Sequence, residues 1–174
     1  EAITPPEGMT RVSGWLGYDA KGRIWTASGP TNAPGGALRF DPKTKTFTQF
    51  TSPTAQMTYG ITGDADGNGW WTGVNDDIMV YSDASDQAHE IRLPSQPPAE
   101  YVKPGDFAPG EQIPQPGIGG KQSPRRPIAD LKGSAVWIPN FYGNTVLRID
   151  ARTKALTYYA APYPAMNPYE AAVD

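Results

Sequence analysis

The chain has 174 residues, of which 38% are hydrophobic and 11% aromatic, and this composition fits a folded domain rather than global disorder. The formal net charge of −3 gives no broad positive field, which disfavours binding to nucleic acid or to anionic membranes. The absence of cysteine excludes disulfides, thiolate metal sites and cysteine nucleophiles, and no apolar run reaches the roughly 18 residues of a membrane helix.

A short motif, Asp-x-x-Gly followed by Trp, occurs three times along the chain. Its copies begin at Asp19, Asp64 and Asp130, which lie 45 and 66 residues apart, and Asp174 lies a further 44 residues on. A period near 45 is typical of four-stranded propeller blades. The longer interval fits the same repeat with an insertion of about 21 residues.

Each repeat predicts a small antiparallel sheet. The first strand ends at the Asp-x-x-Gly turn and the second begins near the Trp, because Gly tolerates the backbone of a tight hairpin. Third strands are predicted at 37–40, 77–81 and 145–149, and fourth strands at 46–50, 88–93 and 156–159.

The predicted fold class is therefore all-β, a β-propeller of three four-stranded antiparallel blades in a partial or open ring. The blades span about 10–51, 57–94 and 125–160, and a next blade begins at 168. Three blades are too few to close a ring, since propellers typically have four to eight. We therefore expect further blades or partners to cover the open ends.

The predicted insertion, residues 95–124, is rich in proline and cannot continue a hydrogen-bonded ladder. It precedes the first strand of the third blade. One end of the blades carries the loops before the first strands and the loops between the second and third strands, and we call this end the loop face. We therefore expect the insertion to lie beside the loop face. It either caps this face or extends from it as a docking arm. The alternative is a tolerated surface loop without a partner.

The repeats resemble a known family of propellers. The best copy reads Tyr-Gly-Ile-Thr-Gly-Asp-Ala-Asp-Gly-Asn-Gly-Trp-Trp-Thr, from Tyr59 to Thr72. It is similar to the blades of the virginiamycin B lyase (streptogramin lyase) family, with their Tyr-Gly-Ile start, Asp-x-Asp-Gly-Asn turn and Trp-Phe-Thr strand. The resemblance covers nearly the whole chain outside the insertion. It implies the architecture more strongly than an activity, because this signature is mostly structural.

The catalytic set that the resemblance implies is missing. Members of the family open a cyclic depsipeptide with histidines, a glutamate and a magnesium ion. The family's glutamate commonly follows Trp-Phe-Thr, and the matching positions here are Ser28, Gly73 and Asn140. The single histidine, His89, falls in a predicted outermost strand, far from the propeller axis. We expect no catalytic residue, no metal site and no cofactor.

Three other patterns have a structural and a functional interpretation. The turn at Asp64, Asp66 and Asn68 resembles the start of a calcium loop but lacks the downstream bidentate glutamate, so a hairpin turn is favoured. His89 is interpreted as a surface histidine rather than a general base. The recurring tryptophans favour a core between blades over a carbohydrate platform; they are Trp25, Trp70, Trp71 and Trp137.

The loop face carries the binding candidates. They are the aromatic, amide and charged residues that the propeller topology places there: Tyr59, Asn75, Asp76, Asp77, Arg125, Arg126, Asn140, Tyr142 and Tyr169. Asp76 and Asp77 form the only adjacent carboxylate pair on this face, a pattern that more often marks a solvated loop than a metal site.

These features predict a non-catalytic β-propeller module that mediates protein–protein interaction, as an accessory part of a larger exported or membrane-associated assembly. Protein partners would cover the open propeller edges or bind the 95–124 loop. The resemblance implies a periplasmic or extracellular location. One alternative is a metal-dependent lyase or lactonase-like enzyme whose catalytic residues lie mostly outside this 174-residue segment. Another is a site for a small ligand among the aromatic and arginine residues of the loop face.

Overall fold

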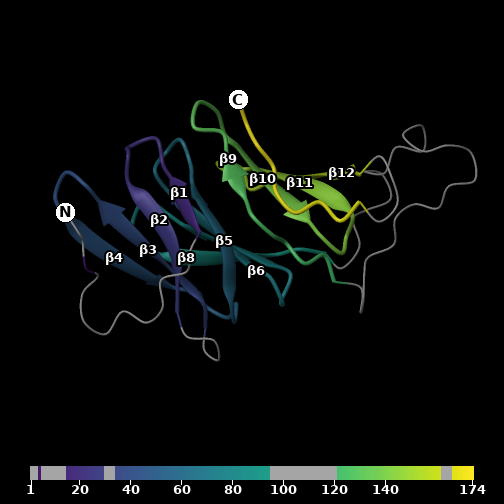
Figure 1. The fold of residues 1–174 in the computed structure, drawn as a ribbon, viewed down its shortest axis with the longest axis horizontal. Coiled ribbons are helices and arrows are strands. Elements are labelled where there is room, and N and C mark those ends of the chain that lie inside the picture. Colours follow the sequence, from purple (N-terminus) through teal and green to yellow (C-terminus); the bar gives the residue numbers. More distant parts are fainter. Residues whose placement is uncertain (1–3, 5–14, 30–33, 95–120, 162–165) are drawn as a thin grey trace, which may run out of the picture.

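A computed structural model describes residues 4, 15–29, 34–94, 121–161 and 166–174, and it shows three four-stranded antiparallel sheets (Figure 1). Blade 1 comprises β1 (Leu16–Tyr18), β2 (Ile24–Ser28), β3 (Gly36–Asp41) and β4 (Thr46–Thr51). Blade 2 comprises β5 (Thr58–Gly63), β6 (Gly69–Gly73), β7 (Ile78–Ser82) and β8 (Ala88–Arg92). Blade 3 comprises β9 (Ile128–Ala129), β10 (Ala135–Asn140), β11 (Thr145–Asp150) and β12 (Leu156–Ala160).

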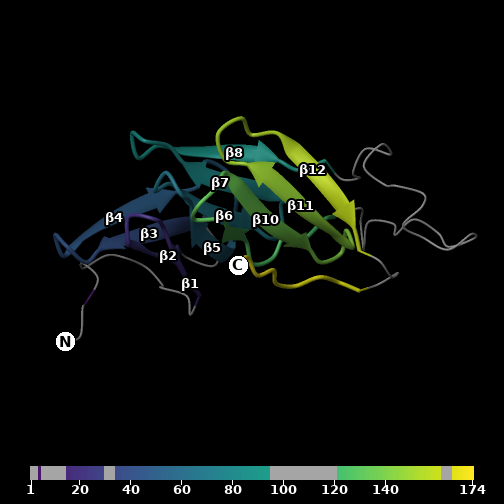
Figure 2. The same cartoon turned by 90° about the horizontal axis from the view of Figure 1, so that it is seen from above.

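In each blade the strands follow one another in chain order, and the first strands β1, β5 and β9 are neighbours. Figures 1 and 2 show blade 2 between the other two blades, so the three sheets form an arc rather than a ring. The predicted all-β partial propeller is confirmed. Most of the predicted 95–124 insertion lies outside the described residues. The part of the chain that the structure describes contains no helix suited to crossing a membrane.

The repeated aspartate fixes both the turn and the tryptophan that follows it. In blade 2, Asp64 Oδ1 accepts the backbone N–H groups of Asp66 (3.0 Å) and Asn68 (2.8 Å), and Oδ2 accepts the indole N–H of Trp70 at 2.8 Å. In blade 1, Asp19 Oδ2 accepts the indole N–H of Trp25 in the same way, at 2.9 Å. A buried indole donor must have an acceptor, so this aspartate selects the tryptophan rotamer as well as the hairpin.

Two apolar cores hold the blades together. Between blades 1 and 2, Trp25, Phe50 and Trp71 pack in one cluster. The ring centroids of Trp25 and Phe50 are 5.2 Å apart, and those of Phe50 and Trp71 are 6.1 Å apart. Between blades 2 and 3, Trp70 and Met79 pack with aliphatic side chains of blade 3, which are Val136, Ile138, Leu147 and Ile149. The prediction of an inter-blade core is confirmed for Trp25, Trp70 and Trp71, each 0% exposed.

The same prediction is wrong for Trp137. The pairing of Trp137 with Ile128 corresponds to that of Trp70 with Thr62, so Trp137 occupies the position of the repeated tryptophan, yet it is only half-buried. It packs on Tyr159, 5.6 Å between ring centroids, and Tyr159 is 46% exposed. The physical reason is that no blade among the described residues packs on this side of blade 3.

We call this side the outer face of blade 3. Strand register puts six side chains on it: Trp137, Pro139, Val146, Arg148, Thr157 and Tyr159. Strand β11 alternates strictly between buried and half-buried residues, which is the pattern of a sheet covered on one side. In contrast, four of the five residues of β7 in blade 2 are buried.

A glutamate of blade 2 also holds the linker that arrives from blade 1. Glu90 Oε1 accepts the backbone N–H groups of Thr54 and Ala55, at 2.6 and 2.8 Å, and Oε2 accepts the Thr54 hydroxyl at 2.6 Å. Partial burial acts to raise the pKa of Glu90, but these hydrogen bonds outweigh it and hold the pKa below its usual value.

Candidate functional site

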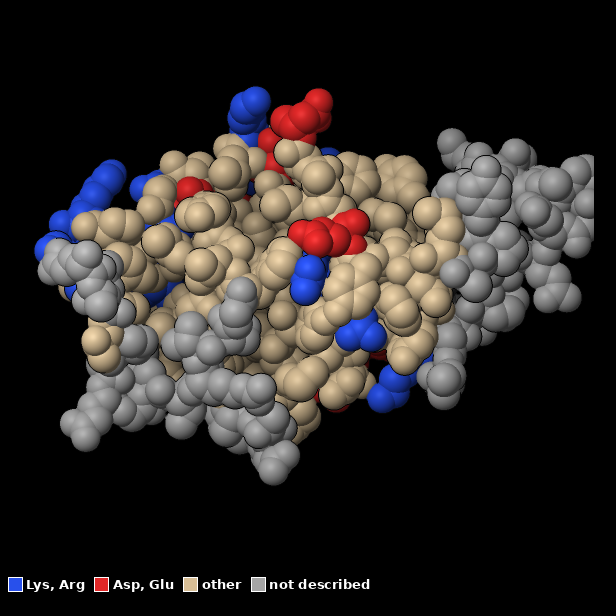
Figure 3. All heavy atoms as spheres, in the orientation of Figure 1, with Lys and Arg blue, Asp and Glu red and all other residues tan. Residues whose placement is uncertain are grey.

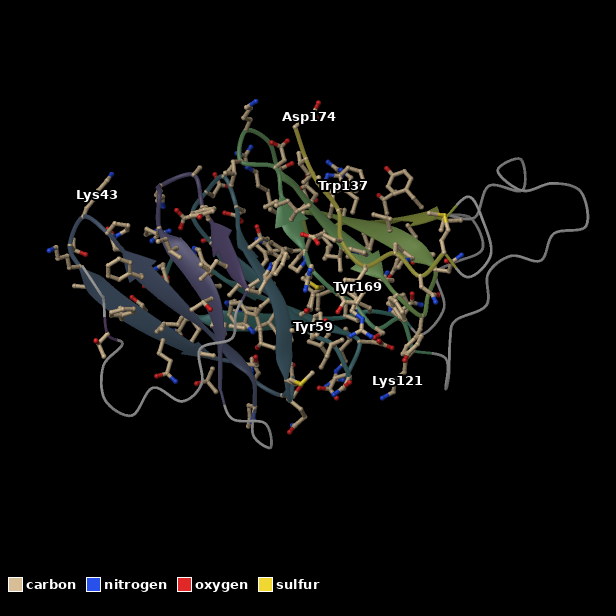
Figure 4. All side chains as sticks on the ribbon, viewed as in Figure 1. Lys43, Tyr59, Lys121, Trp137, Tyr169 and Asp174 are labelled. Carbon is tan, nitrogen blue, oxygen red and sulfur yellow. The ribbon has the colours of Figure 1, made fainter. Side chains whose placement is uncertain are left out.

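The loop face brings together one arginine and three aromatic rings from different segments. The guanidinium carbon of Arg125 lies 5.0 Å from the ring centroid of Tyr59, 4.8 Å from that of Phe141 and 5.5 Å from that of Tyr169. Tyr169 meets Tyr59 and Phe141 edge to face, at 6.0 and 5.8 Å. Figure 4 shows Tyr59 and Tyr169 close together near the middle of the molecule. We call these four residues the Arg125 cluster.

The backbone beneath this cluster is fixed by hydrogen bonds. The Arg125 N–H donates to the carbonyl of Pro139 at 2.9 Å, and the Arg125 carbonyl accepts the Thr72 hydroxyl at 3.0 Å. A side chain on Gly60 would collide with this segment, since its Cβ would lie 2.7 Å from the Arg125 carbonyl oxygen. The arginine therefore starts from a rigid position between blades 2 and 3.

Among the described residues, the Arg125 side chain has rings around it but no hydrogen-bond acceptor. Its Nε is buried and has no hydrogen-bond partner, and its guanidinium donates to no residue that the structure describes. Rings attract a cation through their π faces, but they do not replace strong oxygen acceptors for five N–H donors.

The neighbouring arginine is already paired. Arg126 Nη1 lies 3.2 Å from a carboxylate oxygen of Glu170, and its guanidinium lies 4.0 Å from the Trp15 ring and 5.0 Å from the Tyr169 ring. A parallel bridge joins the backbones of Arg126 and Glu170, so the segment after blade 3 meets the chain just before β9. Figure 3 shows only small charged patches over the middle of this view, surrounded by uncharged surface.

The other charged candidates hold linkers in place. Asp77 Oδ1 and Oδ2 accept the backbone N–H groups of Ser123 and Gln122, both within 2.9 Å, and so fix the chain just before blade 3. Asp76 accepts the Gln56 N–H at 2.8 Å, and the Asn75 carbonyl accepts the Lys121 ammonium at 2.8 Å. These residues share the loop face with the Arg125 cluster but act as structural clamps.

The two remaining candidates differ in access. Asn140 is fully buried; its amide donates to the Thr145 hydroxyl at 3.1 Å, whereas its Oδ1 has no partner in the described structure. Tyr142 is 36% exposed and meets Phe141 edge to face at 5.2 Å, so it extends the aromatic surface of the cluster.

The calcium-loop and histidine patterns both have structural explanations. The Asp64 carboxylate is used by backbone and indole donors, as described above, and the described residues contain no group of three or more side chains that could hold a metal ion. His89 lies on β8, stacks on Tyr81 at 5.2 Å and bonds Asp83 at 2.7 Å. The hydrogen bond from His89 lowers the pKa of Asp83.

A cavity of about 200 Å³ lies between the first strands of the three blades. Its wall is mainly apolar and includes residues of β1, β5 and β9 together with the Arg126 and Glu170 side chains.

Two features of the site were not predicted from the sequence. Trp15 is an unpredicted partner of Arg126, and only the arc geometry brings these residues together. The clamp made by Asp77 was also missed, although an Asp before a strand and opposite a long insertion is the available signal.

The fold and this geometry define a β-propeller domain. No family model matches the sequence, and no curated protein matches it. Among solved structures, virginiamycin B lyase from Staphylococcus aureus is similar with a TM-score of 0.63 and 20% identity, over 95% of this chain and 46% of that one. AztD from Citrobacter koseri is similar with a TM-score of 0.55 and 16% identity, over 92% of this chain and 37% of that one.

A third neighbour is the extracellular domain of the hybrid two component system BT4673 from B. thetaiotaomicron, with a TM-score of 0.52 and 14% identity, over 88% of this chain and 16% of that one. The chain thus spans less than half the length of each of these structures. At such identities the similarity shows the propeller fold, and the predicted resemblance to virginiamycin B lyase holds at that level.

Proposed function

We propose that the chain is a non-catalytic β-propeller module that binds another protein through the outer face of blade 3. The observation that supports this proposal is the apolar outer face of blade 3, since the corresponding faces of blades 1 and 2, at Trp25 and Trp70, are completely covered by another sheet. The occupant we propose is a β-sheet of a partner protein that presents aliphatic side chains. That is the chemistry with which blade 3 itself covers Trp70.

The outer face has the composition of an interaction surface. It combines a tryptophan, a half-exposed tyrosine, a valine and an arginine, and Trp, Tyr and Arg are the residues most enriched at binding hot spots. Tyr169 and Glu170 lie beside Arg126, two residues before β9, on the side where the first strand of a covering sheet would lie. The partner would therefore meet a surface on which this segment already lies next to the start of blade 3.

The setting that we propose is exported, periplasmic or extracellular, with the module as an accessory part of a larger assembly. The supporting observation is the similarity to a propeller that is itself an extracellular domain.

The proposal is tested with the native polypeptide carrying Tyr159→Asp, compared with Tyr18→Asp. Both tyrosines are exposed, at 46% and 58%, but Tyr18 lies on β1 in blade 1. A buried unpaired carboxylate would oppose docking on blade 3. In sedimentation, wild type and Tyr18→Asp should run as an assembly, and Tyr159→Asp as the polypeptide alone. A wild type that sediments alone, or an assembly that survives Tyr159→Asp, would contradict the proposal.

A further inference from the structure

We infer that the Arg125 cluster is a binding site for a single carboxylate group carried by an apolar molecule, with Arg125 as the residue that holds the anion. This site lies on the loop face and does not depend on the proposed docking to the outer face of blade 3.

The first argument is the unused hydrogen-bonding capacity of Arg125. The guanidinium donates no hydrogen bond within the described structure, and its Nε is both buried and without a partner. A buried donor without an acceptor costs about 1–3 kcal/mol, and an oxygen supplied by a ligand would remove this cost. Carboxylates match the planar fork of an arginine with two parallel N–H···O bonds.

The second argument concerns charge, and it favours a monoanion. Arg126, the adjacent cation, is already paired with Glu170 at 3.2 Å. Arg125 therefore has one positive charge that no described carboxylate compensates within ion-pair distance. A phosphate dianion would require a second free cation, whereas one carboxylate balances the charge.

The third argument comes from the walls. Tyr59, Phe141 and Tyr169 place ring centroids within 5.5 Å of the guanidinium carbon, and Tyr142 adds a ring that is 36% exposed. Water is thereby kept from part of the cation, which strengthens a hydrogen-bonded ion pair. The same rings offer contact area for an aromatic or aliphatic body attached to the carboxylate.

The arginine is also held ready for a ligand. Its backbone donates to Pro139 and accepts from Thr72, and close packing at Gly60 prevents the segment from shifting toward blade 2. A ligand would therefore lose little free energy to the ordering of this part of the site.

The experiment is an NMR titration of the ¹⁵N-labelled chain with sodium benzoate, following the Arg125 Nε–H signal, which Arg125→Gln identifies by its loss. We expect a saturable shift of this signal, and about tenfold or greater loss of benzoate affinity in Arg125→Gln. Benzamide, which has nearly the same shape without the charge, should bind at least about tenfold more weakly than benzoate.

Two further variants control for folding and charge. Arg152→Gln removes an arginine whose side chain is 66% exposed in blade 3, and it should bind benzoate like wild type. Arg125→Lys keeps the charge without the fork and should bind roughly tenfold more weakly than wild type. Unchanged benzoate binding in Arg125→Gln, a wild-type Nε–H signal that does not move, or inorganic phosphate that binds as tightly as benzoate would each overturn the inference.

Discussion

Blade 2 packs between two other blades, whereas blade 3 has a blade on only one side among the described residues. Both are built on one repeat, and in both an aspartate closes the first hairpin before a tryptophan on the second strand. Trp70 of blade 2 is 0% exposed, whereas Trp137 of blade 3 is half-buried. The difference shows that the repeat determines where the tryptophan lies in its blade, while the next blade determines whether it is core or surface.

The largest contrast is expected for the two tryptophans. Trp70→Ala should lower the free energy of unfolding by about 3–5 kcal/mol, because it leaves a cavity between two blades and an aspartate without its indole donor. Trp137→Ala should cost only about 1–2 kcal/mol, since part of its surface already faces solvent and no following blade packs on it among the described residues. Urea unfolding of both variants measures the difference. Equal losses would mean that blade 3 is covered as blade 2 is.

The next contrast is between Asp64 and Asp130, the equivalent turn aspartates of blades 2 and 3. Asp64→Ala removes acceptors for two backbone N–H groups and for the buried Trp70 indole, and it should cost about 2–3 kcal/mol. Asp130 accepts the Lys132 N–H at 2.8 Å and is half-exposed, so Asp130→Ala should cost about 1 kcal/mol or less. Urea midpoints for the two variants decide, and a larger loss for Asp130→Ala would contradict this account of the turn.

Ion pairs link blade 2 to each neighbour with different geometry. Arg39 of blade 1 makes two bonds to Asp86, at 2.6 and 2.8 Å, and lies over Trp25 and Phe50. Arg152 of blade 3 reaches Asp66 at 3.2 Å with both side chains exposed. Arg39→Gln should therefore cost about 1–2 kcal/mol in thermal or urea unfolding, and Arg152→Gln should cost clearly less. A larger loss of stability for Arg152→Gln than for Arg39→Gln would contradict this ranking of the two ion pairs.

The smallest effect concerns acid and the Glu90 contact with blade 1. Its pKa is lower in the folded chain than its ordinary value of 4.5, so the contact stabilises the fold above that value. This stability is lost as the pH falls through the folded pKa. Glu90→Gln should cost about 1 kcal/mol near neutral pH and should flatten the loss of stability below about pH 4.5. An acid profile identical to that of wild type would exclude this role.

Much of the fold could be predicted because its signals are local and repeated. The strands, the Asp-x-x-Gly turns and the three-blade period all follow from short patterns such as the one from Tyr59 to Thr72. The exposure of Trp137 could not be predicted in this way, because periodicity reveals the position of a residue in a repeat but not the presence of a neighbouring blade.

The candidate site was predictable as a face but not as a set of contacts. Topology placed Tyr59, Arg125 and Tyr169 at one end of the blades, and the structure puts them within one cluster. The topology alone could not separate these three residues from Asp76 and Asp77. The sequence does not show which carboxylates accept hydrogen bonds from the backbone N–H groups of distant linkers.

The most direct test is hydroxyl-radical oxidation of the tryptophans, quantified by mass spectrometry, in the 174-residue chain and in the native assembly. In the chain alone, Trp137 should be oxidised several-fold faster than Trp25, Trp70 and Trp71, which are fully buried. In the assembly, Trp137 should become as protected as the other three. Equal oxidation of Trp137 in both samples would contradict the claim that the outer face of blade 3 is a docking surface.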